Sequence, residues 1–456
     1  MQIKLITDRA LVLGAVIVAG FVAAFLIAAP VFAANSSYTE IQRGRYLVNA
    51  GDCAACHTNR KDQPFAGGFP VPTPFGVIYS TNITPDKDTG IGKWTQQDFY
   101  NAMHHGVRRN GEHLYPAFPY PWFTKMTRTD VNAIKAYLDT VQPLQVQNKP
   151  LGLPWPLNWR GAMVVWNTLF FKPGKFVPQP DKSAVWNRGA YLVEGAGHCA
   201  ACHTPKNLFG GTKSGLNLVG GDAGEHWFAP SLTSNQRAGL GSWSKAEIID
   251  YLKTGSNART AAAGSMADVI RDSTQHLNDA DLDAIATYLK DVPNAGTNRS
   301  KSVETVPVTA SATVVGVSDN QSTVGNKPRN ITSTNSTVSQ TVMEHGAGLY
   351  LDNCAGCHMQ NGKGQAHIFP SIVGSSVLQA SKPDTVVHLI LTGFKRPATT
   401  SKPTEFAMPA FNTKLSDAEI ADLVSYVRNA WGNQAAAISA SAVAKIRDDL
   451  KLDTNQ

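Results

Sequence analysis

Three short stretches of this 456-residue chain share one arrangement of cysteine and histidine. The pattern Cys-x-x-Cys-His occurs at 53–57, 199–203 and 354–358, and these copies contain all six cysteines of the chain. This spacing is the attachment signature of c-type haem, in which both thiols form thioethers to the porphyrin and the histidine ligates the iron. The sequence therefore predicts three covalently bound haem c groups. The predicted attachment residues are Cys53, Cys56, Cys199, Cys202, Cys354 and Cys357, and the predicted iron ligands are His57, His203 and His358.

Other uses of cysteine fit this pattern less well. A disulfide framework would need cysteines elsewhere in the chain, and a thioredoxin-like pair does not need a histidine directly after its second cysteine. A zinc site usually takes four ligands, and no copy of the motif has a second cysteine pair beside it. Haem attachment is therefore the strongest interpretation.

The second axial ligand decides what such a haem does. Methionine raises the potential and suits electron transfer, whereas an open position permits chemistry on peroxide or another small molecule. Met408 stands in FAMPAF, just before the last predicted helix of its repeat, and Met266 precedes the corresponding helix of the second repeat. Pro370, twelve residues after His358, can accept the hydrogen bond of the ligating imidazole. We predict Met266 and Met408 as sixth ligands.

The first repeat departs from this pattern, because Phe118-Pro119 stands where Met-Pro is expected. Met103 lies on a predicted helix that starts after Thr95 and is the first candidate for the sixth ligand. Several alternatives stay open, and they are a nearby histidine (His104, His105 or His113), Met126 and an open sixth position. Met126 directly precedes the helix cap Thr127, which favours a packing role for this side chain.

Similar elements surround each motif. A short predicted helix runs into each cysteine pair, over 43–51, 188–197 and 345–353. Each repeat ends with a predicted helix, over 127–141, 278–292 and 416–431, that opens on a capping residue with an acid three positions later. Apolar residues recur along these helices at helical spacing. This plan predicts a mainly α fold of three tandem cytochrome c domains with a flexible linker before the third.

The domain boundaries follow from composition. We expect cytochrome c domains at 35–149, 181–295 and 343–432, a flexible linker at 296–342 that is rich in Ser, Thr and Asn, and a C-terminal tail at 433–456. A Trp/Pro-rich connector at 150–180 either packs the first two domains together or forms a patch for lipid or a partner subunit.

The first 34 residues are typical of an export signal. Lys4 and Arg9 precede an apolar run at 11–29, and Val31–Ala33 offers small residues for cleavage. Because the apolar run is long, an uncleaved membrane anchor is the alternative. Both interpretations put the rest of the chain outside the cytoplasm, at the periplasmic face of the bacterial inner membrane.

The charge pattern excludes one class of partner. The net charge is +7 and the isoelectric point is near 9.0, but the chain has no run of Lys and Arg that would follow a nucleic acid. No G-x-G-x-x-G segment follows a predicted strand, so the sequence gives no sign of a dinucleotide site. A substrate-oxidising cofactor would then belong to another polypeptide.

Taken along its length, the sequence resembles the triple-haem cytochrome c subunits of bacterial membrane-bound dehydrogenases that act on alcohols, aldehydes, gluconate or sorbitol. The resemblance rests on RGRYLVNAGDCAACHT, HLYPAFPYPWFTKMT, LNDADLDAIATYLK and MPAFNTKLSDAEIADLVSYVRNAWG. Family members often have YPAMPY where this chain has YPAFPY, and the linker at 296–342 is longer than usual.

The resemblance implies an electron-transfer subunit that accepts electrons from a catalytic dehydrogenase subunit and passes them to ubiquinone in the membrane. On that interpretation the chain is not catalytic alone. Two alternatives remain. One is a haem enzyme of the peroxidase or thiosulfate-oxidising type, which needs one open iron site. The other is an electron shuttle to a terminal oxidase.

Overall fold

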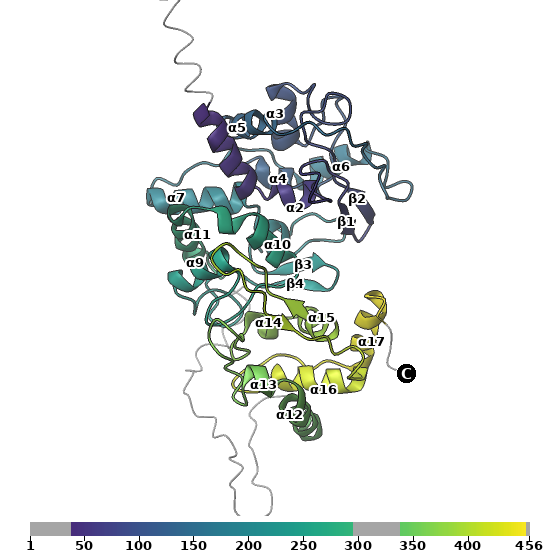
Figure 1. The fold of residues 1–456 in the computed structure, drawn as a ribbon, viewed down its shortest axis with the longest axis vertical. Coiled ribbons are helices and arrows are strands. Elements are labelled where there is room, and N and C mark those ends of the chain that lie inside the picture. The colour runs from purple at the N-terminus through teal and green to yellow at the C-terminus, as the bar shows by residue number, and fades with distance from the viewer. Residues whose placement is uncertain (1–37, 295–337, 453–456) are drawn as a thin grey trace, which may run out of the picture.

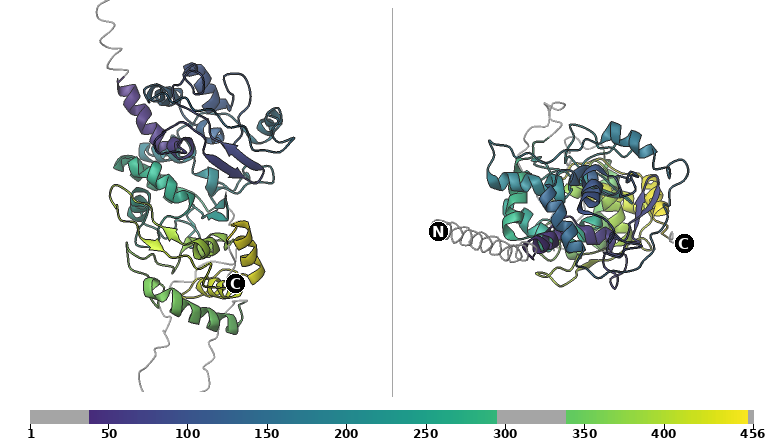
Figure 2. Two further views of the ribbon diagram at one scale, coloured as in Figure 1. Left: turned by 45° about the vertical axis from the view of Figure 1, so that its right-hand side comes forward. Right: turned by 90° about the horizontal axis from the view of Figure 1, so that it is seen from above.

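The computed structural model describes residues 38–294 and 338–452. It is mostly helical, and the strands within these ranges form three two-stranded antiparallel pairs. Three bodies are stacked along the long axis in chain order, with the second between the first and the third (Figures 1 and 2). The predicted signal or anchor (1–34) and nearly all of the predicted linker (296–342) lie outside the described residues. Among the residues that are described, no helix has both the length and the apolar character needed to cross a membrane.

The three domains share the order of their main helices, while the hairpin after the motif occurs only in the first two. The first contains a helix over 38–50, α2 (Cys53–His57), β1 (Pro70–Thr73), β2 (Gly76–Tyr79), α3 (Gln96–His105), α4 (Tyr120–Phe123) and α5 (Arg128–Leu138). The second contains α7 (Ala184–Tyr191), η1 (Leu192–Ala196), α8 (Ala200–His203), β3 (Gly221–Gly224), β4 (Trp227–Ala229), α9 (Lys245–Thr254), α10 (Ser265–Asp272), η2 (Thr274–His276) and α11 (Asp279–Asp291). The third contains α12 (Gln340–Asn353), α13 (Ala355–His358), α14 (Ser376–Gln379), α15 (Asp384–Thr392), β5 (Phe394–Lys395), β6 (Ala407–Met408), α16 (Asp417–Val427) and α17 (Ala440–Asp449).

The last helix of each repeat crosses the helix that leads into the Cys pair. These last helices, α5, α11 and α16, start at Thr127, Asn278 and Ser416, whose side chains accept a hydrogen bond from the amide three residues later. At each crossing the first helix carries a glycine, namely Gly44, Gly189 and Gly346. A Cβ atom there would lie 1.8, 1.9 and 2.5 Å from backbone oxygens of the last helix. Only glycine allows the two helices to approach this closely.

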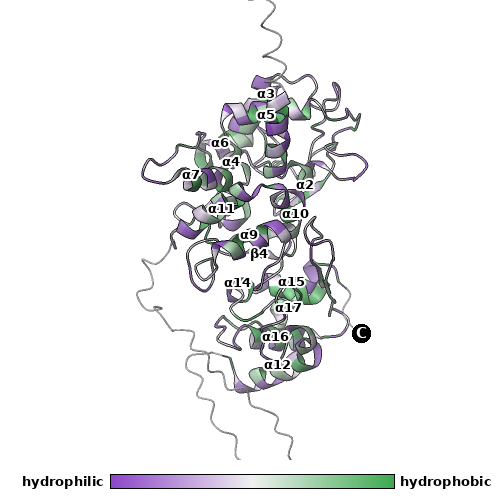
Figure 3. Cartoon of the chain, turned by 60° about the vertical axis from the view of Figure 1, so that its left-hand side comes forward, coloured by the Kyte–Doolittle hydropathy of each residue, from purple (hydrophilic) through white to green (hydrophobic). Residues whose placement is uncertain are grey.

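The apolar side chains form two cores. One core is shared by the first two domains, and the other belongs to the third domain. The apolar helix α15 lies in the second core (Figure 3). Helix α17 also packs there through Val443 and Ile446, while the buried Arg447 donates to Asp417 at 2.8 Å. The predicted C-terminal tail (433–456) therefore contributes a helix to the third domain, which its composition did not reveal.

The first two domains exchange a pair of hydrogen bonds. Tyr46 of the first domain donates to Asp281 of the second at 2.6 Å, and Tyr191 of the second donates to Asp130 of the first. Each carboxylate is also held by an arginine of its own domain. The third domain has Gly348 at the corresponding position, which faces open space. The reciprocal contact therefore joins only the first two domains.

The connector supports both accounts given for it. The ring of Phe176 packs edge-on against that of Tyr191, and its backbone amide donates to the carbonyl oxygen of Lys125 at 2.9 Å. This end of the connector therefore fills the boundary between the first two domains. In contrast, α6 (Ala162–Phe170) has no buried residue, and Trp155 and Leu169 are 83% and 67% exposed. The part of the connector around Trp155 and α6 therefore presents exposed apolar side chains.

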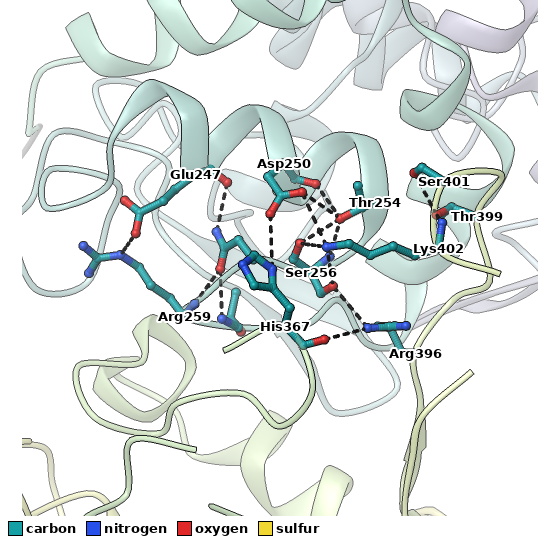
Figure 4. A network of polar contacts seen from close by, with 12 residues as sticks. Glu247, Asp250, Thr254, Ser256, Arg259, His367, Arg396, Thr399, Ser401 and Lys402 are labelled. Atoms are coloured by element: carbon teal, nitrogen blue, oxygen red, sulfur yellow. Dashed lines mark hydrogen bonds and ion pairs between the residues drawn. The ribbon is translucent and has the colours of Figure 1, made fainter. Parts of the chain in front are cut away.

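Polar contacts join the second domain to the third (Figure 4). Arg396 of the third domain donates to the hydroxyl of Ser256 in the second at 3.4 Å, and it also donates to the carbonyl oxygen of His367 in its own domain at 3.1 Å. Lys402 donates to the carbonyl oxygen of Ser256 at 3.2 Å. Trp227 stacks on His388 with ring centroids 4.1 Å apart. The third domain is thus attached by hydrogen bonds and a ring contact, without a shared core.

The reciprocal Tyr–Asp contact predicts a stability change that depends on pH. Burial alone would raise the pKa of Asp281, but hydrogen bonds from Arg188 and Tyr46 outweigh it and hold that pKa below its usual range. The Tyr46→Phe substitution should lower the free energy of unfolding at pH 7 by about 1.5–3 kcal/mol, the usual range for a bond to a charged group. A carboxylate with a lowered pKa stabilises the fold above its unfolded value of about 4, and this contribution disappears as the pH falls through the folded pKa.

Urea unfolding of the haem-loaded protein, followed by circular dichroism, measures this difference. The loss caused by Tyr46→Phe should be full at pH 7 and shrink below about pH 4. Tyr38→Phe is the matched control, because Tyr38 is exposed. Equal effects of the two substitutions at pH 7 would show that the contact contributes nothing to the pairing of the domains.

Candidate haem-binding sites

The cysteine pairs lie at the start of three short helices, α2, α8 and α13. All six thiols are free, and the second cysteine of each pair is exposed. Burial raises the pKa of Cys53 and of Cys199 to about 12. A redox-active Cys-x-x-Cys pair has a lowered thiol pKa. The pairs therefore fit attachment to a cofactor better than thiol–disulfide chemistry.

Each motif histidine is oriented by a backbone carbonyl. The Nδ1 atoms of His57, His203 and His358 lie 2.6, 2.6 and 2.9 Å from the carbonyl oxygens of Thr81, Pro230 and Pro370. A carbonyl oxygen can only accept, so Nδ1 carries the proton and the lone pair of Nε2 is free to bind a metal. Burial lowers the pKa of all three imidazoles despite these bonds, which favours the neutral form that binds iron.

Two of these carbonyl partners were not predicted. The sequence indicated Pro370, and its contact with His358 is present, but it did not indicate Thr81 or Pro230. A signal for them exists. Each partner is followed by a polar residue and then an aliphatic one, in TNI at 81–83, PSL at 230–232 and PSI at 370–372. Alignment of the three repeats through these tripeptides identifies all three partners.

After the helix that follows the carbonyl partner, each domain continues with a further segment, 106–118, 255–266 or 393–408, which we call the returning segment. Helices α3, α9 and α15 end at Gly106, Gly255 and Gly393, which all have a positive φ; Gly106 and Gly255 adopt the left-handed helical conformation. In the second domain, Ala262 donates to the carbonyl of Gly255 at 2.8 Å, and Met266 follows four residues later. In the third domain, Met408 pairs with Phe394, the residue after Gly393. Both predicted methionines thus lie on the returning segment.

The returning segment of the first domain carries no methionine. Leu114 donates to the carbonyl of Gly106 at 2.7 Å, and the residue four positions later is Phe118. Phe118 is partly buried against the core of its domain, as Met266 and Met408 are against theirs. The backbone register therefore puts Phe118 at the position of Met266.

The other candidates of the first domain have different surroundings, and one of them, His113, also lies on the segment between Gly106 and Phe118. Met103 is buried within the core. Met126 is fully buried at the boundary with the second domain, where a Cβ atom on Gly195 would lie 3.8 Å from its Cγ. His105 is exposed, His113 accepts a hydrogen bond from Asn167 at 2.9 Å, and the Nδ1 atom of His104 is hydrogen-bonded to Thr124 at 3.2 Å.

The three sites form a row. A Cβ atom on Gly51 would lie 3.5 Å from the sulfur of Cys53 and 3.9 Å from the carbonyl oxygen of Ala196, next to the second motif. The second and third sites approach each other on their other sides. A pocket of about 370 Å³ is lined there by Gly264 and Ala267, which flank Met266, and by Gly393 and Phe394 beside Met408. The second site therefore lies between the other two.

A zinc ion held by protein side chains alone needs about four ligands. Within 38–294 and 338–452, no three His, Cys, Asp or Glu side chains come together in a way that could hold a metal ion. What each motif offers is two thiols and one oriented imidazole. This donor set fits an iron that is carried by a covalently attached porphyrin.

Comparison with known proteins agrees with this donor set. The family model for cytochrome c matches residues 41–142, 187–293 and 343–431. The chain is 39% identical to the gluconate 2-dehydrogenase cytochrome c subunit of Pantoea cypripedii over 430 residues, which is 91% of each chain. It is 38% identical to the cytochrome c subunit of the quinone alcohol dehydrogenase of Gluconobacter oxydans (strain 621H), covering 89% of this chain and 82% of the relative.

The fructose dehydrogenase cytochrome subunit of Gluconobacter japonicus is 39% identical, covering 91% of this chain and 84% of the relative. These matches extend over all three repeats, and the family confirms that haem c is covalently bound to domains of this type. The chain belongs to the cytochrome c family and, within it, to the family of cytochrome c subunits of dehydrogenases.

Proposed function

We propose that this chain is the triple-haem electron-transfer subunit of a membrane-bound dehydrogenase complex. It accepts electrons from a catalytic dehydrogenase subunit and passes them to ubiquinone. The observation that carries this proposal is the row of three sites, each with a free cysteine pair and a carbonyl-oriented histidine. A row of redox centres in one chain suits transfer between two partners. The relatives are cytochrome subunits of gluconate, alcohol and fructose dehydrogenases.

The chain's own residues would hold and tune three haem c groups. The six motif cysteines form the thioethers, and His57, His203 and His358 present Nε2 to the iron. Met266 and Met408 supply the sixth ligand in the second and third domains. When bound, each haem supplies one-electron redox chemistry, and a His/Met ligand pair gives a raised potential. Met103 is the sequence-based candidate for the sixth ligand in the first domain.

The substrate is oxidised by the partner in this proposal. An alcohol, an aldehyde or a sugar derivative is the substrate class that the relatives' names support. Export by residues 1–34 brings the chain to the periplasmic face of the inner membrane. The exposed apolar side chains around α6, among them Trp155, Trp159 and Leu169, support peripheral contact with the membrane that holds the quinone.

The direct test is electron transfer in the reconstituted complex. The purified chain alone should oxidise no alcohol, aldehyde or sugar, whereas the chain with its catalytic partner should support substrate-dependent reduction of a quinone analogue. The Cys199→Ala/Cys202→Ala variant should lose most of this activity, because it lacks the middle haem of the row. Circular dichroism checks that this variant is folded. Substrate-driven quinone reduction at the same rate by the partner without this chain would contradict the proposal.

The methionine ligands are tested by spectroscopy. Met266→Ala and Met408→Ala should each convert one haem from low spin to high spin, since no other methionine lies on either returning segment. Met126→Leu is the control, because it preserves the volume of a buried side chain and should leave every haem spectrum unchanged. A low-spin spectrum in Met266→Ala or Met408→Ala would assign the sixth ligand to another residue.

A further inference from the structure

We infer that the haem iron of the first domain has no protein ligand at its sixth position and binds a neutral diatomic gas there, beside Phe118. This inference rests on the proposed attachment of haem to Cys53 and Cys56. It makes the first site a ligand-binding centre, in contrast to the other two.

The argument starts from the shared backbone route. The amide of Leu114 bonds to the carbonyl of Gly106, and Phe118 comes four residues after Leu114. In the same way, the amide of Ala262 bonds to the carbonyl of Gly255, and Met266 comes four residues after Ala262. Both side chains are partly buried against the same core. The ring of Phe118 lies 5.5 Å from that of Phe123, centroid to centroid. A phenyl ring has no lone pair to donate, so the residue at the methionine position of this domain cannot ligate iron.

Met103 occupies a packing position in all three domains. The corresponding residues are Leu252 on α9 and Ile390 on α15, and the three side chains are 4%, 9% and 6% exposed. An aliphatic side chain fills this position in the two domains that have a methionine on the returning segment. Burial of Met103 is therefore explained by packing alone. Met126 is likewise engaged at the boundary with the second domain, beside Gly195.

The histidines of the first domain also point elsewhere. His104 corresponds to Lys253 on α9, and Lys253 pairs with Asp279 at the start of the last helix of its domain. This helix face is thus directed at the last helix and not at the returning segment. His104 follows it, since its Nδ1 atom bonds to Thr124 just before the cap of α5, although its Nε2 atom has no partner. His113 bonds to Asn167 of α6, and His105 is exposed.

The chemistry of the site selects its ligand. The Phe118 ring is apolar carbon with no hydrogen-bond donor, so an anion held against it would lose its hydration without compensation. A neutral diatomic molecule such as CO or NO carries no such cost. Binding is simple coordination to ferrous iron, and no bond in the protein is broken.

The experiment is CO titration of the dithionite-reduced, haem-loaded chain, with total haem measured on the same sample. One of three haems should form a CO complex, and the ferric protein should show a high-spin signal of the same fraction. Phe118→Met should abolish CO binding and the high-spin signal, because it restores the ligand found in the second domain. The matched control Phe118→Leu should keep both, and Met103→Leu should also keep them. Met266→Ala should raise the CO-binding fraction to two of three.

The outcomes separate this inference from the proposed function. Three haems per chain without a CO complex, or CO binding that first appears in Met103→Leu or His104→Leu, would overturn the open site and leave the three-haem assignment intact. CO binding that persists in Phe118→Met would also overturn it. Two haems per chain would contradict the proposed function itself.

Discussion

The hydrogen bond from the motif histidine to a backbone carbonyl is the constraint on which each site depends. It fixes the tautomer and the ring orientation of the imidazole, so that Nε2 is the atom left for iron. The partner carbonyl is not local, because it lies 24, 27 and 12 residues after the histidine in the three domains. The three loops therefore differ in length but must end in the same contact between the imidazole and the carbonyl.

The loops meet this constraint in two ways. In the first two domains a β-hairpin, β1–β2 or β3–β4, lies between the histidine and the residue whose carbonyl it contacts. The third domain closes with a short turn in which Gln365 and Phe369 pair. Because the end points coincide, the helices that follow, α3, α9 and α15, start from equivalent positions. Phe118 and Met266 then stand four residues after an amide that bonds to the glycine at the end of the preceding helix, whereas Met408 pairs with Phe394, the residue after Gly393.

Domain pairing follows a different principle at the two boundaries. The first two domains share a core, and Tyr46 and Tyr191 each donate a hydrogen bond to an aspartate of the other domain, so the two domains form one unit. The third domain is joined by polar contacts of Arg396 and Lys402 with Ser256, which cost less to separate than a shared core (Figure 4). The second site lies between the others, and electrons that cross the chain from end to end would pass through it.

Much of the fold and of the sites could be predicted from the sequence, because motifs and helix caps are local. The Cys-x-x-Cys-His copies, the capped last helices and the contact of His358 with Pro370 are examples. The reciprocal Tyr–Asp contact could not be predicted, since Tyr46 and Asp281 are 235 residues apart. Helix α17 was missed because its sequence is rich in Ala and Ser, and its burial depends on Asp417 and the rest of the third domain. Phe118 was visible in the sequence as the residue at the place of the expected methionine, and the structure adds its backbone register relative to Gly106.

The most direct test of the three haem sites is the number of covalently bound haems per chain. Pyridine haemochrome absorbance against protein concentration, with intact-protein mass spectrometry, measures that number. The account predicts three haems in the wild-type chain and two in the Cys199→Ala/Cys202→Ala variant. Two or fewer haems in the wild-type chain would contradict it.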